Sequence, residues 1–214
     1  MVPYYPVFLD LAGKPTLVIG GGNVAEGKVR GLLAAEASLT LIAPSLTPEL
    51  RGLAESGRLQ HVEREYRDGD LEGYTVCFVA TDDGAVNAAV AAEGRKRGIW
   101  VNAADDPQNC DFILPSVVRQ GDVVLAASTG GASPALARRL REELTAFLDD
   151  DYAPLAELLA AVRADLRRRN LSPDAEVWSQ AIDARFRALV AQRRPDEARE
   201  HLMQRLGVTE ALQG

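Results

Sequence analysis

Cysteine and histidine are scarce in this chain, with two of each among 214 residues. The cysteines, Cys77 and Cys110, lie far apart, and neither belongs to a Cys-x-x-Cys pair. This spacing excludes a disulfide framework and the common zinc-binding signatures. The two histidines, His61 and His201, are also far from each other in the sequence.

Net positive charge is missing as well, because the formal net charge is -7 and the isoelectric point is about 5.0. A general nucleic-acid-binding protein needs a basic face to neutralise phosphates, so we expect no nucleic-acid partner. The N-terminal residues show neither a basic segment nor a long apolar one, and no apolar run reaches the ~18 residues of a membrane span. We therefore expect a cytoplasmic protein that makes no membrane contact.

The first half of the chain alternates short apolar runs with segments of helical spacing that are rich in alanine and leucine. This alternation is typical of a parallel sheet with helices on both faces, which is the doubly wound, Rossmann-type α/β class. The expected strands cover residues 15–20, 38–43, 59–65, 75–81 and 99–104.

The pattern changes after residue 111. Two apolar runs joined through "RQGD" predict a β-hairpin, and a helix follows with Ser133 as its N-cap and Pro134 at its first position. Only helices are expected beyond the acidic run at 149–151. The sequence thus predicts a Rossmann domain at 1–111, a hairpin and helix at 112–148, and a C-terminal helical domain at 149–214.

Two helices of the C-terminal part are predicted from their apolar spacing. A second Ser-Pro pair, Ser172 and Pro173, is expected to start the later one, and Trp178 and Phe186 are expected to pack in a core or a dimer seam. The earlier helix has one apolar face, formed by Leu155, Leu158, Leu159, Val162 and Leu166.

A glycine-rich turn follows the first expected strand in the segment "VIGGGNVAEGKV". Gly20, Gly22 and Ala25 match the G-x-G-x-x-A fingerprint of dinucleotide-binding proteins, in the strand-turn-helix context that the fingerprint requires. The glycines allow a tight turn and close approach of the backbone to a pyrophosphate, whose charge then lies at the helix N-terminus beside Asn23 and Val24. A glycine turn without a ligand is the alternative.

The end of the second strand holds the ribose in such folds, and here it reads "LIAPS". Ala43 and Pro44 occupy the position where an acid would bind the NAD ribose or an arginine the NADP phosphate. Ser45 and backbone groups remain available. Because no basic residue lies nearby in the sequence, we expect NAD.

The fourth strand is followed by "TDDGAVN", where a doubly wound sheet places its binding crevice. Thr81 and Asp82 are candidates for lining the cofactor site, and Asn87 lies on the helix that follows. The alternative is that Asp82 or Asp83 caps this helix.

An acidic stretch, "IWVNAADDPQNCDF", ends the fifth strand. It allows three interpretations: a solvated turn, a metal site, or a catalytic carboxylate beside the cofactor cleft. The metal site would need Asp105, Asp106, Cys110 and Asp111, which mix hard and soft ligands without a known spacing. We therefore expect no permanent metal, and we expect Cys110 and Cys77 to be small buried side chains.

The segment "STGGASPALARR" predicts an anion-binding site, because successive backbone amides precede a helix N-terminus. Its hydroxyl donors and an arginine one turn inside the helix add to this arrangement. A capped helix after a glycine turn is the alternative. The candidate residues are Ser128, Thr129, Gly130, Gly131, Ser133 and Arg138.

Taken in order, "YPVFLDLAGKPTLVIGGGNVAEGKVRGLL", "FVATDDGAVN", "VNAADDPQNCDFILPSVV" and "GDVVLAASTGGASPALARRLRE" resemble the precorrin-2 dehydrogenase and sirohydrochlorin ferrochelatase family, the N-terminal module of sirohaem synthases. The resemblance covers residues 1 to about 148. It implies that precorrin-2 is oxidised to sirohydrochlorin with NAD as acceptor, that some members insert ferrous iron, and that the hairpin region forms a homodimer. It also leads us to expect the stand-alone form of the enzyme, without a methyltransferase domain.

The resemblance also assigns residues. The family's Asn-x-x-Asp-x-Pro motif falls on Asn102, Asp105 and Pro107, which makes Asp105 the implied catalytic residue and places Asn102 at the cofactor. A carboxylate at this end of a sheet strand lies beside the cleft and is suited to take a proton as hydride leaves. Asp106 is the rival candidate. Lys28 matches a basic position of the family that meets a carboxylate or phosphate, and a solvated lysine is its alternative.

Two other functions stay open at this point. A sensor would bind the dinucleotide without chemistry, and it would need neither the acid after the fifth strand nor a second anion site. A chelatase without dehydrogenase activity would not need the intact glycine turn.

Overall fold

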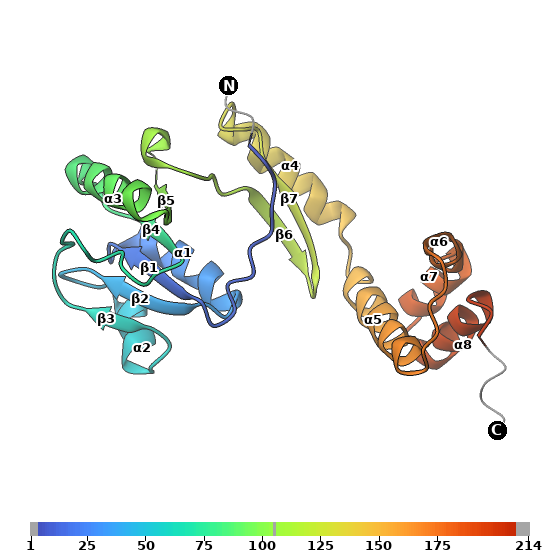
Figure 1. The fold of residues 1–214 in the computed structure, drawn as a ribbon. Coiled ribbons are helices and arrows are strands. Elements are labelled where there is room, and N and C mark those ends of the chain that lie inside the picture. Colours follow the sequence, from blue (N-terminus) through green and yellow to red (C-terminus); the bar gives the residue numbers. More distant parts are fainter. Residues whose placement is uncertain (1–3, 105, 209–214) are drawn as a thin grey trace. The chain divides into compact units, whose positions relative to one another are not determined.

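The computed structural model describes residues 4–104 and 106–208 (Figure 1). The chain forms two compact units, the first ending at Leu114 and the second beginning at Pro115. Each unit is described by itself below. The finer division of the C-terminal part at residue 149 stays a prediction.

The first unit is built on a parallel sheet of five strands, β1 (Pro15–Ile19), β2 (Ser38–Ile42), β3 (Gln60–Val62), β4 (Val76–Val79) and β5 (Trp100–Ala103). Their order across the sheet is β3-β2-β1-β4-β5. Every pairing is parallel, so each connection crosses over through a helix or a long loop. The α/β prediction is confirmed, with all five strands inside the expected ranges.

Helices cover both faces of this sheet, as the alternating side chains of the strands require (Figure 1). On β1, Val18 packs in one core with α1 (Asn23–Ala34) and α2 (Pro48–Glu55), whereas Leu17 packs in another with α3 (Gly84–Arg97). Because both faces are buried, the strands are apolar throughout. A short 3-10 helix, η1 (Pro107–Asn109), follows β5.

The third strand is shorter than the expected range 59–65. It ends at Val62, because the amide of Arg64 turns back to the Val62 carbonyl oxygen at 2.9 Å. The residues that follow leave the sheet and form a loop whose polar contacts are described below.

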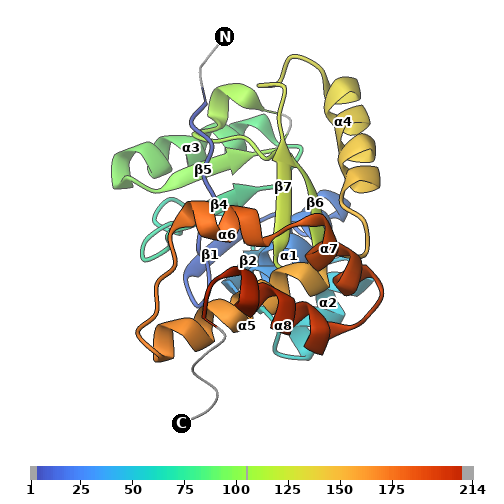
Figure 2. The same cartoon turned by 90° about the vertical axis from the view of Figure 1, so that its right-hand side faces the viewer.

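The second unit opens with an antiparallel hairpin of β6 (Ser116–Gln120) and β7 (Val123–Ala127). The turn between them contains Gly121 at a φ of +55°, a conformation that favours glycine. Helix α4 (Pro134–Phe147) lies beside the hairpin (Figure 2). The predicted hairpin through "RQGD" is confirmed.

Four further helices form the rest of this unit: α5 (Tyr152–Arg168), α6 (Ala175–Ala181), α7 (Ala184–Ala191) and α8 (Pro195–Arg205). Their shared core contains Val162 and Leu166 of the predicted apolar face, with Leu155, Leu158 and Leu159 packed against it. The core prediction for Phe186 and Trp178 is also confirmed, since Phe186 is fully buried there and Trp178 packs at the edge. In the described part of the chain, no helix is both long and apolar enough to cross a membrane.

The predicted helix start at Ser172 is wrong. Helix α6 begins after Asp174, and the segment is interrupted again before α7. The interruption has a physical cause at Asp183, whose carboxylate accepts the amide of Phe186 at 2.8 Å and is held by His201 at 3.0 Å. An acid with two such partners caps a new helix, so the chain starts one there.

Candidate functional site

The candidate site lies at the carboxyl edge of the parallel sheet, where the strand order reverses between β1 and β4. Ligands of doubly wound sheets bind at this point because the loops after the two strands diverge to opposite faces. Two backbone hydrogen bonds fix the loop starts here. Gly20 donates to the Ile42 carbonyl at 3.0 Å, and Ala80 donates to the Ile19 carbonyl at 2.7 Å.

The three consecutive glycines of the turn have different surroundings. A Cβ at Gly20, whose φ is +111°, would overlap the Ala80 carbonyl oxygen, and one at Gly21 would overlap that of Ser45. A Cβ at Gly22 would meet nothing within 4 Å. The first two glycines therefore allow close packing of backbone against backbone, and the third leaves open space over the turn. The sequence fingerprint did not include Gly21. The only sign of its role in the sequence was that three glycines follow one another.

The N-terminus of α1 follows directly. Its N-cap is Gly22, and no side chain caps it. The first-turn amides belong to Asn23, Val24 and Ala25, with Val24 half exposed and Ala25 buried against the core. Open space at Gly22, a terminus without a side-chain cap and the positive end of the helix dipole fit the pyrophosphate of a dinucleotide.

The end of β2 offers backbone groups and no acidic side chain. Ala43 is buried, and its carbonyl oxygen accepts a hydrogen bond from His61 Nε2 at 2.9 Å. Pro44 and Ser45 are exposed. The ribose was predicted to bind at Ala43 and Pro44, which have no side-chain hydrogen-bond donor. The next residue in the sequence, Ser45, has a hydroxyl that can donate.

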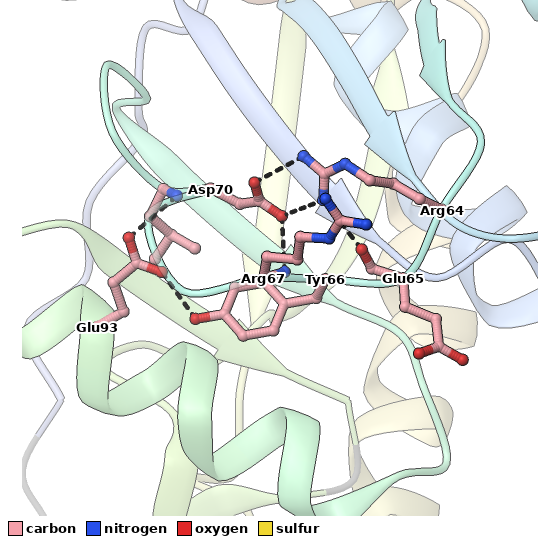
Figure 3. A network of polar contacts seen from close by, with 7 residues as sticks. Arg64, Glu65, Tyr66, Arg67, Asp70 and Glu93 are labelled. Carbon is pink, nitrogen blue, oxygen red and sulfur yellow. Dashed lines mark hydrogen bonds and ion pairs between the residues drawn. The ribbon is translucent and has the colours of Figure 1, made fainter.

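A polar network begins after β3 and was not visible in the sequence (Figure 3). Arg64 donates to both carboxylate oxygens of Asp70, at 2.6 and 2.7 Å, and the amide of Arg67 donates to the same group at 2.8 Å. The hydrogen bonds from Arg64 hold the pKa of Asp70 below its ordinary value. Paired groups three and six residues apart in a loop carry no sequence signature, so only the fold reveals them.

The second half of the network ties this loop to α3 (Figure 3). Glu93 is buried at 3% exposure, and it accepts hydrogen bonds from the Tyr66 hydroxyl at 2.7 Å and the Leu71 amide at 3.2 Å. Arg97 pairs with the same carboxylate at 2.6 Å. Burial, together with the bond to Glu93, raises the pKa of Tyr66. The loop after β3 is therefore held against α3.

The segment after β4 was expected either to line the cofactor site or to cap the helix that follows. Asp83 caps α3 by accepting from the amides of Ala85 and Val86 at 2.8 and 3.3 Å. Thr81 supports this turn, since its hydroxyl accepts the Asp83 amide at 3.1 Å. Asp82 is exposed at the same edge. Asp83 is thus the cap, and Asp82 stays a candidate for the cofactor site.

The end of β5 brings two predicted residues together. Lys28 Nζ donates to Asn102 Oδ1 at 2.8 Å, and the same ammonium lies 5.6 Å from the centre of the Phe78 ring. Asn102 is 5% exposed, and its Nδ2 donates to the Phe112 carbonyl oxygen at 2.9 Å. A lysine of α1 therefore reaches across β4 to the fifth strand.

The acidic stretch after β5 is described in part. Asp105, the implied catalytic residue, lies outside the described residues. Asp106 is the N-cap residue of η1, and its carboxylate accepts a hydrogen bond from Asn109 Nδ2 at 2.8 Å.

Cys110 and Asp111 bond to the backbone of β5. The Cys110 thiol donates to the Ala103 carbonyl at 3.0 Å, and burial raises its pKa. The Asp111 carboxylate accepts the Val101 amide at 2.8 Å. Within residues 4–104 and 106–208, no three histidine, cysteine or acidic side chains gather as metal ligands.

The predicted anion-binding segment lies in the second unit, between β7 and α4. Its hydroxyls bind its own amides: Ser128 accepts from Gly130 at 3.1 Å, Thr129 accepts from Ser133 at 3.1 Å, and Ser133 accepts from Leu136 at 3.2 Å. The predicted N-cap at Ser133 is confirmed. An anion here would meet the other amides of the turn or displace a hydroxyl.

Two more members of this predicted set are exposed. Gly131 has a φ of +85°, and Arg138 lies one turn inside α4. The structure therefore groups the predicted residues into two sets, one at the sheet edge of the first unit and one at the start of α4.

Comparison with known proteins identifies the first unit. A family profile described as "Putative NAD(P)-binding" matches residues 7–116, which is just over half of the 214 residues. The chain belongs to this NAD(P)-binding family. A second profile, described as "Sirohaem biosynthesis protein central", matches residues 125–146 of the same NAD(P)-binding chain. That range contains the loop before α4 and most of the helix.

Curated relatives extend the likeness across both units. The NAD(P)-binding chain is 37% identical over 202 residues to "Siroheme synthase" of Photobacterium profundum and 38% identical over 203 residues to that of Methylococcus capsulatus. Each alignment covers 94% of this chain and 43% of the relative, so the chain spans less than half the length of these proteins.

A solved structure matches the whole fold. "SirC, precorrin-2 dehydrogenase" has a TM-score of 0.77 and 29% sequence identity, and the match covers 94% of the NAD(P)-binding chain and all of SirC. Together with the relatives, it confirms the family resemblance stated from the sequence.

Proposed function

We propose that this chain oxidises precorrin-2 to sirohydrochlorin with NAD as the hydride acceptor. One observation carries the proposal: the open glycine turn lies at the end of β1, and the Lys28–Asn102 contact lies at the end of β5 of the same sheet. The fold that holds both features matches a precorrin-2 dehydrogenase over the full length of that protein. A sensor would need the first feature alone.

The cofactor site is assigned to the residues at the ends of four strands. The α1 amides bind the pyrophosphate, and the turn at Gly22 leaves room for it. Bound NAD supplies the hydride acceptor. The assigned residues are Gly20, Gly22, Asn23, Val24, Ala25, Ala43, Pro44, Thr81, Asp82 and Asn102.

Asp105 is proposed as the base. Removal of two hydrogens from precorrin-2 transfers a hydride to the cofactor and releases a proton, which a carboxylate at the end of β5 accepts. General acid-base help of this kind is worth roughly 100- to 10,000-fold in rate. Asp106, the neighbouring acid, is already bonded to Asn109, which favours Asp105.

The substrate is rich in carboxylates, so the acidic chain must supply local donors. Lys28 provides a positive charge at the sheet edge. The segment from Ser128 to Ser133 provides hydroxyls and the N-terminus of α4, and Arg138 adds a guanidinium. We assign tetrapyrrole binding to these groups, with Gly130 and Gly131 giving the turn its shape.

Three finer statements belong to the same proposal. A homodimer forms through the hairpin and α4. The reason is that α4 has no buried residue, and that three apolar side chains of this region are exposed: Val117 at 45%, Leu136 at 51% and Phe147 at 60%.

Ferrous iron is a further substrate, inserted into sirohydrochlorin. The reaction takes place in the cytoplasm.

An anaerobic assay tests the proposal. Purified protein is mixed with precorrin-2, and NAD and then ferrous ion are added while the tetrapyrrole absorption spectrum is followed. We expect sirohydrochlorin only after NAD, and a further metal-dependent change faster than the uncatalysed rate. No spectral change after NAD would overturn the dehydrogenase, and no change after iron would remove the chelatase alone.

Paired variants test the base. Asp105→Ala should lower the dehydrogenation rate at least about 100-fold, while Asp106→Ala should keep most of it. The reverse result would transfer the role to Asp106.

A further inference from the structure

Asn87 is a buried polar residue at the start of α3, outside the set of residues assigned to the cofactor. It lies one turn inside the helix, where its backbone amide donates to the Asp83 carbonyl at 3.0 Å. The residue is 5% exposed. Burying a side-chain amide costs free energy unless both of its ends find hydrogen-bond partners, so the partner of each end matters.

The amide oxygen of Asn87 has a partner within the protein. The Thr81 hydroxyl donates to Asn87 Oδ1 at 3.3 Å, and the same hydroxyl oxygen accepts the Asp83 amide at 3.1 Å. The N-cap turn of α3 thus holds Thr81, which in turn orients the Asn87 amide. Because the two ends of an amide diverge, the nitrogen of Asn87 is directed away from Thr81.

The amide nitrogen of Asn87 has no such partner. Among residues 4–104 and 106–208, no acceptor is bonded to Asn87 Nδ2. The nitrogen is also not sealed in the core, because within these ranges the only enclosed side-chain nitrogen or oxygen without a partner belongs to Arg169. Asn87 therefore presents an unused donor at an accessible point, although the residue is otherwise buried.

The surroundings of Thr81 place this donor beside the glycine turn. Strand β4 pairs with β1 up to Val79 and Ile19, so the loops that follow the two strands start side by side. A Cβ at Gly20 would lie 3.4 Å from Thr81 Cγ2. Thr81 thus has the turn on the side of its methyl group and Asn87 on the side of its hydroxyl.

The order of the strands indicates which half of the cofactor this donor meets. Strands β2 and β4 lie on opposite sides of β1. The adenosine ribose is assigned to Ala43 and Pro44 after β2, and the pyrophosphate to the α1 amides after β1. The dinucleotide therefore continues over β4 with its second ribose, which links the pyrophosphate to nicotinamide. The hydroxyl groups of this sugar can accept a hydrogen bond from an amide nitrogen.

We propose that Asn87 is a further cofactor-binding residue, whose amide nitrogen donates to a hydroxyl of the nicotinamide ribose. The inference rests on the proposed function, which places NAD at this edge of the sheet. It predicts that Asn87 adds affinity only for ligands that carry the second ribose.

The test compares three ligands in binding titrations on the full chain. NAD has the second ribose and nicotinamide, ADP-ribose has the second ribose alone, and ADP has neither. Asn87→Ala should weaken the binding of NAD and of ADP-ribose about tenfold each, because the same hydrogen bond is lost with both, and should change the Kd for ADP by less than about twofold.

Asp83→Ala is the matched control. It removes the cap of α3 and so loosens the same end of the helix, while the Asn87 side chain keeps its amide. Its Kd for each ligand should stay within about twofold of the wild-type value. An equal loss of NAD affinity in Asp83→Ala would mean that Asn87→Ala acts by loosening α3, which overturns the inference.

Asn87→Asp gives the answer even if the alanine variant does not fold. A carboxylate still accepts from the Thr81 hydroxyl but cannot donate, so NAD and ADP-ribose should again bind at least about tenfold more weakly. Three results contradict the inference: unchanged NAD affinity in Asn87→Asp, an equal loss of ADP affinity in Asn87→Ala, or a loss for NAD that ADP-ribose does not share.

The same proteins separate this inference from the proposed function. Wild type that binds NAD but does not oxidise precorrin-2 would refute the dehydrogenase and leave the role of Asn87 intact. Active wild type whose Asn87 variants bind NAD normally would refute the role of Asn87 alone. Wild type that binds none of the three ligands would refute both.

Discussion

The N-termini of α1 and α4 both follow a glycine-containing turn, and the sequence predicted an anion site at each. In the structure the two termini differ in whether side chains already bond their amides. At α1 no side chain caps the helix, and the space above Gly22 is open. At α4 the Ser133 hydroxyl accepts the Leu136 amide, and further hydroxyls bond the amides of the loop.

This difference distinguishes a helix terminus whose amides have no side-chain acceptor from one whose amides are already bonded. The first-turn amides of a helix need partners, and side-chain caps normally supply them. Thr47 caps α2 and Asp83 caps α3, so α1 differs from the other α-helices described in the first unit. A terminus without a side-chain cap at the point where the strand order reverses favours a ligand there, whereas a capped terminus must exchange one partner for another.

The largest effect is expected from the two packed glycines. Gly20→Ala places a Cβ against the Ala80 carbonyl at a φ of +111°, and Gly21→Ala places one against the Ser45 carbonyl. At Gly20 strain and overlap together should cost at least about 3 kcal/mol of unfolding free energy, and at Gly21 overlap alone should cost about 1 to 3 kcal/mol. Denaturant unfolding measures this cost. A variant as stable as wild type would mean that the turn adapts and that its close packing is not essential.

The next effect separates the third glycine from the first two. Gly22→Val adds a side chain in open space, so the unfolding free energy should change by less than about 1 kcal/mol. The Kd for NAD should rise at least about tenfold, because the branched side chain fills the approach to the α1 amides. Gly27→Ala is the control, because Gly27 also faces open space but lies inside the helix. This variant should raise the unfolding free energy by about 0.5 to 1 kcal/mol and leave the Kd for NAD unchanged. Equal NAD affinity in both variants would contradict the assignment of the turn.

The smallest effects concern the caps. Ser133→Ala and Asp83→Ala each remove a side-chain acceptor and should lower the unfolding free energy by about 1 kcal/mol. Asp82→Ala, beside the true cap, should change it by less than about 0.5 kcal/mol. Thermal melts give the stabilities, and a sirohydrochlorin titration of Ser133→Ala decides whether this hydroxyl also meets substrate. Unchanged affinity would leave Ser133 as a cap alone.

The sequence predicted the sheet well because burial on both faces leaves a strong apolar pattern. Each strand interior falls inside an expected range, and the hairpin and the Ser133 cap have local signals that the structure confirms. The predicted start at Ser172 failed because α6 begins only after Asp174. The interruption at Asp183 was not visible in the local sequence, since one of its two partners, His201, belongs to a later helix.

The site was predicted less completely for a related reason. Glycine spacing pointed to the turn, but the need for Gly21 comes from a carbonyl that the β2 loop supplies. The contact between Lys28 and Asn102 joins residues far apart in sequence and depends on strand register. Interactions that the fold creates cannot be identified from spacing.

Asp111 shows what one of the acids after β5 contributes. Its carboxylate accepts the Val101 amide, and its own amide donates to the Val101 carbonyl, both at 2.8 Å. Since β5 is the last strand of the described sheet, Asp111 bonds at Val101, and Cys110 at Ala103, where a sixth strand would pair. An exposed strand edge is a template for pairing with other chains. With these bonds in place, the backbone groups of Val101 and Ala103 that another strand would need are already paired within the chain.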